Sequence, residues 1–326
     1  RCKNELVFRL VDEWYISCDA IRPAAIKAAA EVEWQPEYLG KRMDDWLKNM
    51  GDWCISRKRF WGLPLPFYKC SECGNLTVVG SRKELKELSD DNVDGLPELH
   101  RPWIDKIQVK CSSCGAKTAR VVEVGDCWLD AGIVPYSTRG YIKDGELSPD
   151  YRPADWVCEM GEQVRLWFYS MLFMGVTISG KAPYKKVSTY EWVFSETGER
   201  FSKTGYMIEF DEAAEKMGVD TMRYYFASQS SSSDIRFGYN RGADARRQLI
   251  SLWNIFSFFQ TYAGIDKPDL ARAEDARKHL TDMDRWLLAR LYEFLTESRK
   301  HYENYNTPMV VRELEQFVES VSNWYV

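Results

Sequence analysis

The sequence predicts an α/β domain that is interrupted by a small insert and followed by a bundle of helices. Runs rich in β-branched and aromatic residues alternate with runs of helical spacing up to residue 237. Two Cys-x-x-Cys-Gly pairs enclose a polar stretch at 81–94, which marks an inserted module at 67–124. Beyond residue 237, apolar residues recur at spacings of three and four, as they do in packed amphipathic helices.

The composition is that of an ordinary globular protein. The 326 residues are 45% hydrophobic and 29% charged, which excludes a disordered tail, a collagen and a short disulfide-stapled domain. The net charge of −5 means that any nucleic-acid contact must come from local patches. No run approaches the roughly 20 apolar residues of a membrane span, and the start does not resemble a signal peptide. We therefore expect a soluble, cytoplasmic protein with reduced cysteines.

Short strands and helices are expected on both sides of the insert. The runs 6–10 and 13–17 are strand-like, and 23–30 has helical character. The run 165–178 is mostly apolar and of helical length, which suits burial against a sheet. The run 186–194 predicts a strand, which the following Ser-Glu-Thr-Gly turn closes.

Three apolar stripes at helical spacing predict the bundle. Thr307 is the predicted N-cap of the last helix, with Pro308 at its first position. The last apolar pattern continues to the end of the chain without a stop, which indicates a segment of a longer protein. The stripes comprise Leu249, Trp253, Phe256 and Gln260; Leu287, Leu288, Leu291 and Leu295; and Val310, Val311, Leu314, Phe317, Val318 and Val321.

The two cysteine pairs, Cys70 with Cys73 and Cys111 with Cys114, predict a four-cysteine zinc site. Each pair supplies two thiolates from one tight turn, and the following glycine permits the positive φ that this turn needs. Because thiolates would fill all four positions, the metal would be structural. The alternative is four unrelated buried cysteines.

The remaining cysteines lack this pairing. Cys18, Cys54, Cys127 and Cys158 have no paired spacing, so we expect them in the core. Cys2 is either a buried thiol or one half of a second zinc knuckle.

The segment 198–205 places a lysine, small hydroxyl residues and glycines on one loop. Such a loop can bring an ammonium group and backbone amides against a polyphosphate. It is not a P-loop, because the Gly-x-x-x-x-Gly-Lys spacing is absent. By itself the segment fits a solvated turn equally well.

Five segments carry more specific wording, in the order DWCISRKRFWGLPLP (52–66), DCWLDAG (126–132), EMGEQVRLWF (159–168), RFSKT (200–204) and GVDTMR (218–223). They resemble, in the same order, the DWxISRQRYWGxPIP, DVWFDSG, EGxDQxRGWF, KMSKS and GADALR motifs of class I aminoacyl-tRNA synthetases. The matching branch of that class uses isoleucine, valine or leucine. The helices at 287–325, which end in SNWY, resemble the start of the family's anticodon-binding bundle.

The resemblance implies the second half of a class I Rossmann-like catalytic domain with a zinc-binding insert, followed by part of an α-helical anticodon-binding bundle. The expected parts are a catalytic segment at 1–66, the insert at 67–124, the second half of the catalytic domain at 125–195, the KMSKS loop with a stem-contact region at 196–240, and the bundle at 241–326.

The resemblance also implies roles for residues of the nucleotide site. Lys203 would contact ATP phosphates in the transition state, with Arg200 and Ser202 in the same loop. Glu159, Glu162 and Gln163, together with Lys203, would bind ATP and the aminoacyl-adenylate.

Two tryptophans match family positions that flank the amino-acid side chain. Trp128 and Trp167 offer flat apolar faces that suit a branched aliphatic group. The alternative for both is packing in the core.

Among the three amino acids, the ISRKRFWGLPLP wording and the insert directly after it favour isoleucine. The resemblance then implies an ATP-dependent ligase that charges tRNA(Ile) through isoleucyl-adenylate, with ATP and Mg²⁺ as substrate, structural Zn²⁺ and a monomeric state. A valine or leucine enzyme is one alternative. A non-catalytic zinc- and tRNA-binding protein is another, in which Arg241, Arg246 and Arg247 would meet tRNA phosphates.

The chain departs from the family pattern at several positions. Tyr190 and Glu191 replace the family's His-Gly, Ala131 replaces a serine, Glu162 replaces an aspartate, and Tyr206 replaces an asparagine. The HIGH motif, which supplies the other clamp on ATP, does not occur in the 326 residues, and the family's editing domain is also missing. We therefore expect this segment alone to be inactive in adenylate formation.

Overall fold

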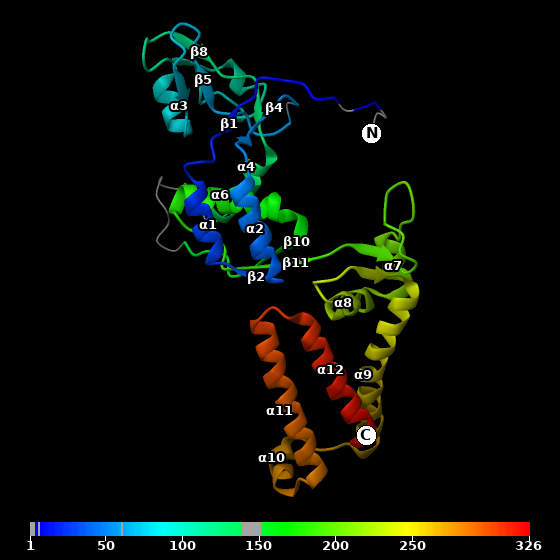
Figure 1. Ribbon diagram of the computed structural model, residues 1–326. Helices are drawn as coiled ribbons and strands as arrows, with labels where there is room; N and C mark the ends of the chain where they lie inside the picture. The colour runs from blue at the N-terminus through cyan, green and yellow to red at the C-terminus, as the bar shows by residue number, and fades with distance from the viewer. Residues whose placement is uncertain (1–3, 6, 60, 139–150) are drawn as a thin grey trace. The chain divides into compact units, whose positions relative to one another are not determined.

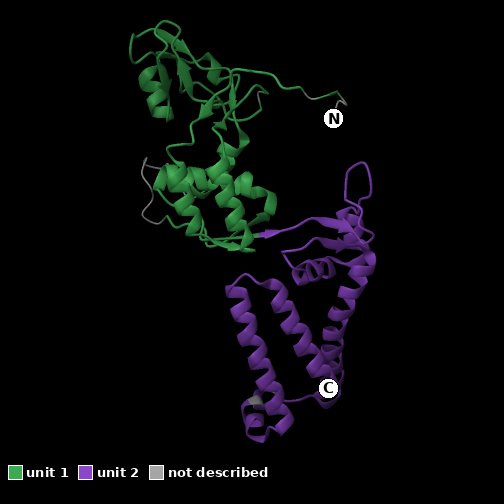
Figure 2. Cartoon of the chain, in the orientation of Figure 1, with its two compact units in different colours: residues 1–188 green, residues 189–326 purple. Residues whose placement is uncertain are grey.

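The computed structural model describes residues 4–5, 7–59, 61–138 and 151–326. The chain divides into two compact units, residues 1–188 and 189–326 (Figure 2). Cys2 and Phe60 lie outside the described residues. In the part of the chain that is described, no helix is both long and apolar enough to cross a membrane.

The core of the first unit is a three-stranded sheet with the order β10-β11-β2, covered by helices. These strands are Val157–Met160, Lys186–Tyr190 and Glu33–Gln35, and β11 pairs parallel to β2. The helices α1 (Arg22–Ala30), α2 (Tyr38–Asn49) and α6 (Trp167–Ser179) contribute most of the buried side chains. On α2, Leu39, Met43 and Leu47 recur every four residues and are completely buried, so one apolar stripe holds this helix in place.

The helix α6 lies in the middle of this core, as its apolar sequence predicts. Most of its residues are buried, and Gly180 ends it in the left-handed conformation with a φ of 71°. Beside it, a Cβ atom at Gly132 would lie 2.9 Å from the carbonyl oxygen of Ser170. Glycine at this position therefore lets the chain after the insert pack directly on the backbone of α6.

Short antiparallel strand pairs connect this core to the insert. One pair is β1 (Tyr15–Ile16) with β3 (Trp53–Cys54), and the other is β4 (Ser56–Arg57) with β9 (Val124–Gly125). β4 follows β3 almost directly in the sequence. The helices α4 (Cys127–Gly132) and α5 (Val134–Ser137) follow β9.

The insert consists of two β-hairpins and a helix around its own small core. The hairpins are β5 (Phe67–Lys69) with β6 (Leu76–Val78), and β7 (Gln108–Lys110) with β8 (Lys117–Ala119). The helix α3 (Arg82–Leu88) covers them, and its N-cap Ser81 accepts a hydrogen bond from the backbone N–H of Glu84. Buried residues of this core include Tyr68, Val109 and Ile104.

The second unit combines a two-stranded parallel sheet with helices (Figure 1). The sheet pairs β12 (Val193–Ser195) with β13 (Ile235–Phe237), and α7 (Phe210–Met217) and α8 (Val219–Ser228) pack near it. The long helix α9 (Tyr239–Asp266) follows, and α11 (Asp282–Glu303) and α12 (Thr307–Trp324) form a helical hairpin. The remaining elements are α10 (Ala273–Ala276) and the 3₁₀ turns η1 (Ile104–Lys106), η2 (Gly161–Arg165), η3 (Leu270–Arg272) and η4 (Arg277–His279).

Three local predictions are wrong. The described residues of the run 6–10 form no strand, and the run 186–194 forms two strands of different sheets rather than one. The last helix has Asn306 at its N-cap, so that Thr307 is its first residue. A single sequence does not reveal which sheet a short apolar run joins, because that depends on partners elsewhere in the chain.

Burial in the bundle also differs from the sequence pattern. Val310, Val311 and Val318 of α12 are buried as the stripe predicts, whereas Trp253 and Phe256 of α9 expose 63% and 50% of their surface. Periodicity predicts that a helix has an apolar face, and it does not say which neighbour covers that face.

Candidate functional site

The four cysteines of the two knuckles converge at one point of the insert, as their spacing predicts. All four sulfur atoms lie within 4.8 Å of one another, and the closest pairs, Cys70 with Cys114 and Cys73 with Cys111, are 3.6 Å apart. A tetrahedral zinc site with Zn–S bonds of about 2.3 Å requires sulfur atoms about 3.8 Å apart. The donor set and its spacing therefore fit a structural zinc ion.

The backbone of each knuckle favours thiolates. Gly74 and Gly115 have φ angles of 73° and 75°, which turn the chain so that amides face the sulfur atoms. Backbone N–H groups, chiefly that of Cys73 for Cys70 and that of Cys114 for Cys111, lower the pKa of both thiols, that of Cys111 to about 6. Hydrogen bonds within each knuckle thus favour the thiolate form of Cys70 and of Cys111.

A buried arginine of the insert binds backbone carbonyls at both ends of the insert. The side chain of Arg120 is 1% exposed, and its Nη1 donates to the carbonyl oxygens of Leu65 and Glu123. Its Nε donates to Asp105 at 3.1 Å, and Arg101 also donates to that carboxylate, at 2.6 Å. Burial raises the pKa of Asp105, but the two arginines outweigh it and leave that pKa below the usual value.

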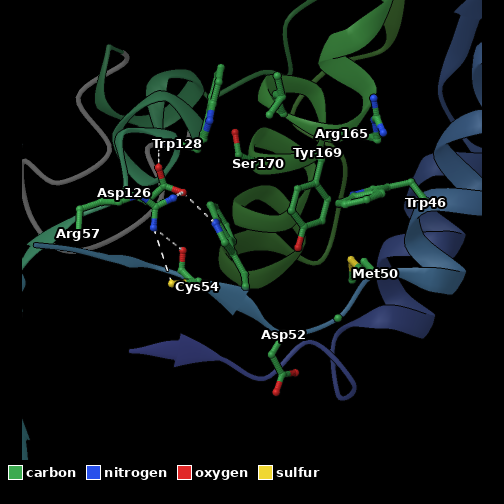
Figure 3. Close-up of a pocket in the computed structure, with 13 residues that line it drawn as sticks. Trp46, Met50, Asp52, Cys54, Arg57, Asp126, Trp128, Arg165, Tyr169 and Ser170 are labelled. Atoms are coloured by element: carbon green, nitrogen blue, oxygen red, sulfur yellow. Dashed lines mark hydrogen bonds and ion pairs between the residues drawn. The ribbon is translucent and has the colours of Figure 1, made fainter. Parts of the chain in front are cut away.

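The first unit contains a pocket of about 340 Å³ beside α6 (Figure 3). Trp128 of α4 lines it, as do Tyr169 and Ser170 of α6 and Trp53 of β3. Aromatic side chains therefore form much of its wall. The charged residues that line it are Asp52, Asp126, Arg57 and Arg165. The other lining residues are Trp46, Met50, Gly51, Cys54 and Leu166.

The second predicted tryptophan is attached to the same small helix. Trp167 is not one of the residues lining this pocket, but its indole N–H donates to the carbonyl oxygen of Ala131 at 3.0 Å. Trp128 belongs to α4, and so does Ala131. The structure thus fixes both tryptophans around α4, and both are partly exposed.

The predicted adenylate ligands of the first unit lie along one short stretch, from the end of β10 through η2. Glu159 accepts a hydrogen bond from the backbone N–H of Met160 at 2.8 Å. Gln163 accepts one from the backbone N–H of Trp167 at 3.0 Å, and Glu162 forms an exposed ion pair with Arg165 at 3.6 Å. The chain therefore brings Glu159, Gln163 and the two tryptophans into one region of the first unit.

The predicted phosphate loop lies in the second unit, between β12 and α7. The first part of the loop turns back along β12. The backbone N–H of Ser195 donates to the carbonyl oxygen of Glu199, and the backbones of Phe194 and Arg200 form an antiparallel β-bridge. The guanidinium carbon of Arg200 lies 3.8 Å from the ring centre of Trp192, a cation–π contact.

The tip of this loop is a tight turn. Gly205 N–H donates to Ser202 O at 3.2 Å, and Ser202 N–H donates to Tyr206 O at 3.1 Å. The rings of Phe201 and Tyr206 lie 5.4 Å apart beneath the turn. Ser202, Lys203 and Arg200 are exposed, so their polar groups are accessible.

The arginines considered for tRNA contact are exposed on the first turns of α9. Arg247 forms an ion pair with Asp244, which offsets part of its charge. Arg241 donates its backbone N–H to Glu196 at 2.7 Å.

The unpaired cysteines differ in burial. Cys18 is buried as predicted, Cys54 and Cys158 are partly buried, and Cys127 is exposed. The core prediction is therefore wrong for Cys127, which is the first residue of α4 and is exposed.

Sequence reasoning missed the buried carboxylate of Asp126, which is 3% exposed and lies at the pocket. Its ion pair with Arg57 joins two segments that are far apart in the sequence. The only sequence signal was that both residues stand in family-like motifs.

The four-cysteine insert, the exposed loop that carries Lys203 and the helices that follow it are consistent with the class of tRNA-charging enzymes that the sequence motifs resemble. The model of the family "tRNA synthetases class I (I, L, M and V)" matches residues 2–238, and that of the "Anticodon-binding domain of tRNA ligase" matches residues 284–326. The chain belongs to the class I tRNA synthetases. This confirms the fold class and the family that the sequence motifs predict.

Curated relatives narrow the comparison. The chain is 35% identical over 345 residues to the isoleucine–tRNA ligase of Methanopyrus kandleri, with 100% of this chain and 32% of the relative covered. It is 36% identical over 341 residues to the ligase of the same name from Dehalococcoides mccartyi, with 100% and 33% covered. The chain thus spans about a third of the length of these relatives.

A solved structure shows the same fold. The crystal structure of a ternary complex of an Agrobacterium radiobacter LeuRS with tRNA and LeuAMS matches with a TM-score of 0.62 at 17% identity. The match covers 83% of this chain and 36% of that chain.

Proposed function

We propose that this chain is part of an ATP-dependent ligase that charges tRNA(Ile) with isoleucine through isoleucyl-adenylate. The observation that carries the proposal is the match along the whole chain to relatives named isoleucine–tRNA ligase. The partners would be isoleucine, ATP with Mg²⁺ and tRNA(Ile), and the enzyme would be a cytoplasmic monomer. The proposed parts are 1–66, 125–195 and 196–240 for catalysis, 67–124 for zinc, and 241–326 for the anticodon-binding bundle.

In the first step, the isoleucine carboxylate attacks the α-phosphorus of ATP and pyrophosphate leaves. Negative charge develops on the phosphoryl oxygens, and the exposed ammonium group of Lys203 suits its stabilisation. Arg200 would add a second cation and Ser202 a hydroxyl from the same loop. In the second step, a ribose hydroxyl at the 3′ end of the tRNA attacks the acyl carbon and AMP leaves.

The first unit would hold the adenylate. Glu159, Glu162 and Gln163 would bind its amino group and ribose hydroxyls, and Trp128 and Trp167 would flank the branched side chain. The four cysteines Cys70, Cys73, Cys111 and Cys114 would hold zinc, which would stabilise the insert without taking part in the reaction.

Amino-acid-dependent exchange of pyrophosphate into ATP by the full-length protein tests the proposal. We expect kcat/KM for isoleucine to exceed that for valine by about 10- to 200-fold, the limit set by one methylene in an apolar pocket. Exchange that is faster with valine or leucine, or absent with all three, would contradict the proposal. The 326-residue chain alone should show no exchange, since it lacks the HIGH motif.

A further inference from the structure

Asp126 is a charged group enclosed by protein. It follows β9 directly and is 3% exposed, and both of its carboxylate oxygens accept hydrogen bonds (Figure 3). One oxygen accepts from the backbone N–H of Trp128 at 3.3 Å. The other accepts from the indole N–H of Trp53 at 3.2 Å and forms an ion pair with Arg57 at 2.9 Å.

The partner of this carboxylate is itself held in place. Nη1 of Arg57 donates to the carbonyl oxygens of Ser56 at 2.8 Å and Cys54 at 3.1 Å. The guanidinium group is thus fixed by its own backbone, and Nη2 is left to meet Asp126. A buried carboxylate without such a partner would be strongly unfavourable, so the pair defines one arrangement of the two strands that carry it.

This arrangement determines where Trp128 stands. Asp126 is the N-cap of α4, and Trp128 is the second residue of that helix. The N-cap hydrogen bond sets the direction in which the helix begins. Trp53, the other neighbour of the carboxylate, packs on α6 with its ring centre 5.6 Å from that of Tyr169 and 5.3 Å from that of Phe173.

We propose that Asp126 and Arg57 are positioning residues that fix Trp128 as the wall of the amino-acid pocket. The inference rests on the proposed function and adds two residues whose expected effect on the reaction passes through Trp128. Recognition of a branched aliphatic side chain depends on a wall that does not move, because the binding energy comes from contact with a surface of fixed shape.

The test uses pyrophosphate exchange by the full-length protein with three variants. Asp126→Asn preserves side-chain volume but removes the charge that holds Arg57, and Arg57→Gln removes the partner from a side chain that is 45% exposed. Asp105→Asn is the matched control, because it breaks the pair between a partly buried aspartate and the buried Arg120, in the insert.

We expect Asp126→Asn to raise KM for isoleucine about tenfold while KM for ATP stays within about twofold, since only the amino-acid wall loosens. Arg57→Gln should give the same selective change at smaller size, and Asp105→Asn should change neither KM. If Asp126→Asn does not fold, the KM values of Arg57→Gln for isoleucine and ATP test the proposal instead.

Two results separate the inference from the function on which it rests. A wild-type protein that exchanges with isoleucine, together with variants whose KM for isoleucine is unchanged or rises in parallel with that for ATP, overturns the positioning role alone. A wild-type protein without isoleucine-dependent exchange overturns the proposed function and the inference with it.

Discussion

The side-chain carbonyl of Gln163 accepts a hydrogen bond from the backbone N–H of Trp167 at 3.0 Å, and so satisfies an otherwise unpaired donor at the start of α6. A residue expected to bind the adenylate therefore also holds the helix that carries a tryptophan of the proposed pocket. Its oxygen serves the helix, which leaves its NH₂ group to donate to a ligand.

Gln163→Glu and Gln163→Ala separate these two roles. Glu keeps an acceptor for the helix N-terminus and loses the donor, so thermal stability should stay near that of the wild type while kcat/KM for exchange falls. Ala loses both, and should also lower the free energy of unfolding by about 1 kcal/mol, a typical loss for a helix cap. Wild-type kinetics for Gln163→Glu would show that the residue is a cap and nothing more.

The cysteine cluster predicts one zinc ion for each chain. Metal analysis of the purified protein should give a ratio near one, and Cys111→Ser should bring it close to zero, because three thiolates hold zinc poorly. Cys127→Ser is the matched control, since Cys127 is exposed and stands outside the cluster. A ratio that Cys111→Ser leaves unchanged would place the metal elsewhere.

Removing the ammonium group of Lys203, the proposed phosphate ligand, should slow the reaction and leave folding unchanged. Lys203→Ala in the full-length protein should lower kcat for exchange by about 100-fold or more, the usual cost of losing a group that stabilises developing charge. Affinity for tRNA should change little. Lys278→Ala, an exposed lysine of the same unit paired with Asp275, should leave exchange unchanged. A similar loss in both variants would speak against a specific role for Lys203.

Asp130 should make the protein less stable at neutral pH. Burial, and after it the charge of Asp126, raise the pKa of Asp130 above its ordinary value of 3.8. A raised carboxyl pKa means that the charged form costs stability, and this cost is fully present above the folded-state pKa and vanishes below about pH 3.8.

Asp130→Asn should therefore raise Tm at pH 7. The gain in the free energy of unfolding should be less than about 1 kcal/mol, because the group is partly exposed. The difference in Tm between this variant and the wild type should decrease as the pH falls toward 4. Asp19→Asn, which removes an exposed carboxylate paired with Arg22, should show no such gain. A difference that is constant with pH would point to packing rather than charge.

Sequence reasoning worked best where the chemistry is local. Each Cys-x-x-Cys-Gly knuckle is complete within a few residues, so the sequence predicted both the cluster and the positive φ of Gly74 and Gly115. The apolar run of α6 was equally clear, because a helix buried on most sides has little choice of residue.

The rest depends on partners that are distant in the chain. The pair of Arg57 with Asp126 exists only because β4 lies beside β9, and no spacing rule links residues on either side of a long insert. The break of the run 186–194 into two strands has the same origin, since β11 pairs with β2 and β12 pairs with β13. The exposure of the apolar α9 face was missed because periodicity does not identify which neighbour, if any, covers a face.

The carboxylate of Glu196 holds the first turn of α9 with both oxygens, through the backbone N–H of Arg241 at 2.7 Å and the side-chain amide of Asn240 at 3.0 Å. A Cβ atom at Gly238 would lie only 2.5 Å from that carboxylate, so the turn packs tightly against the start of the helix. A helix of 28 residues is about 42 Å long, and a tilt of about 5° at its start moves its far end by about 4 Å. Glu196 also opens the turn that leads to Arg200 and Lys203. The loop that carries Lys203 thus begins at the residue that holds the first turn of α9, so a small change in the direction of this turn would displace the far end of the helix several times as much as its start.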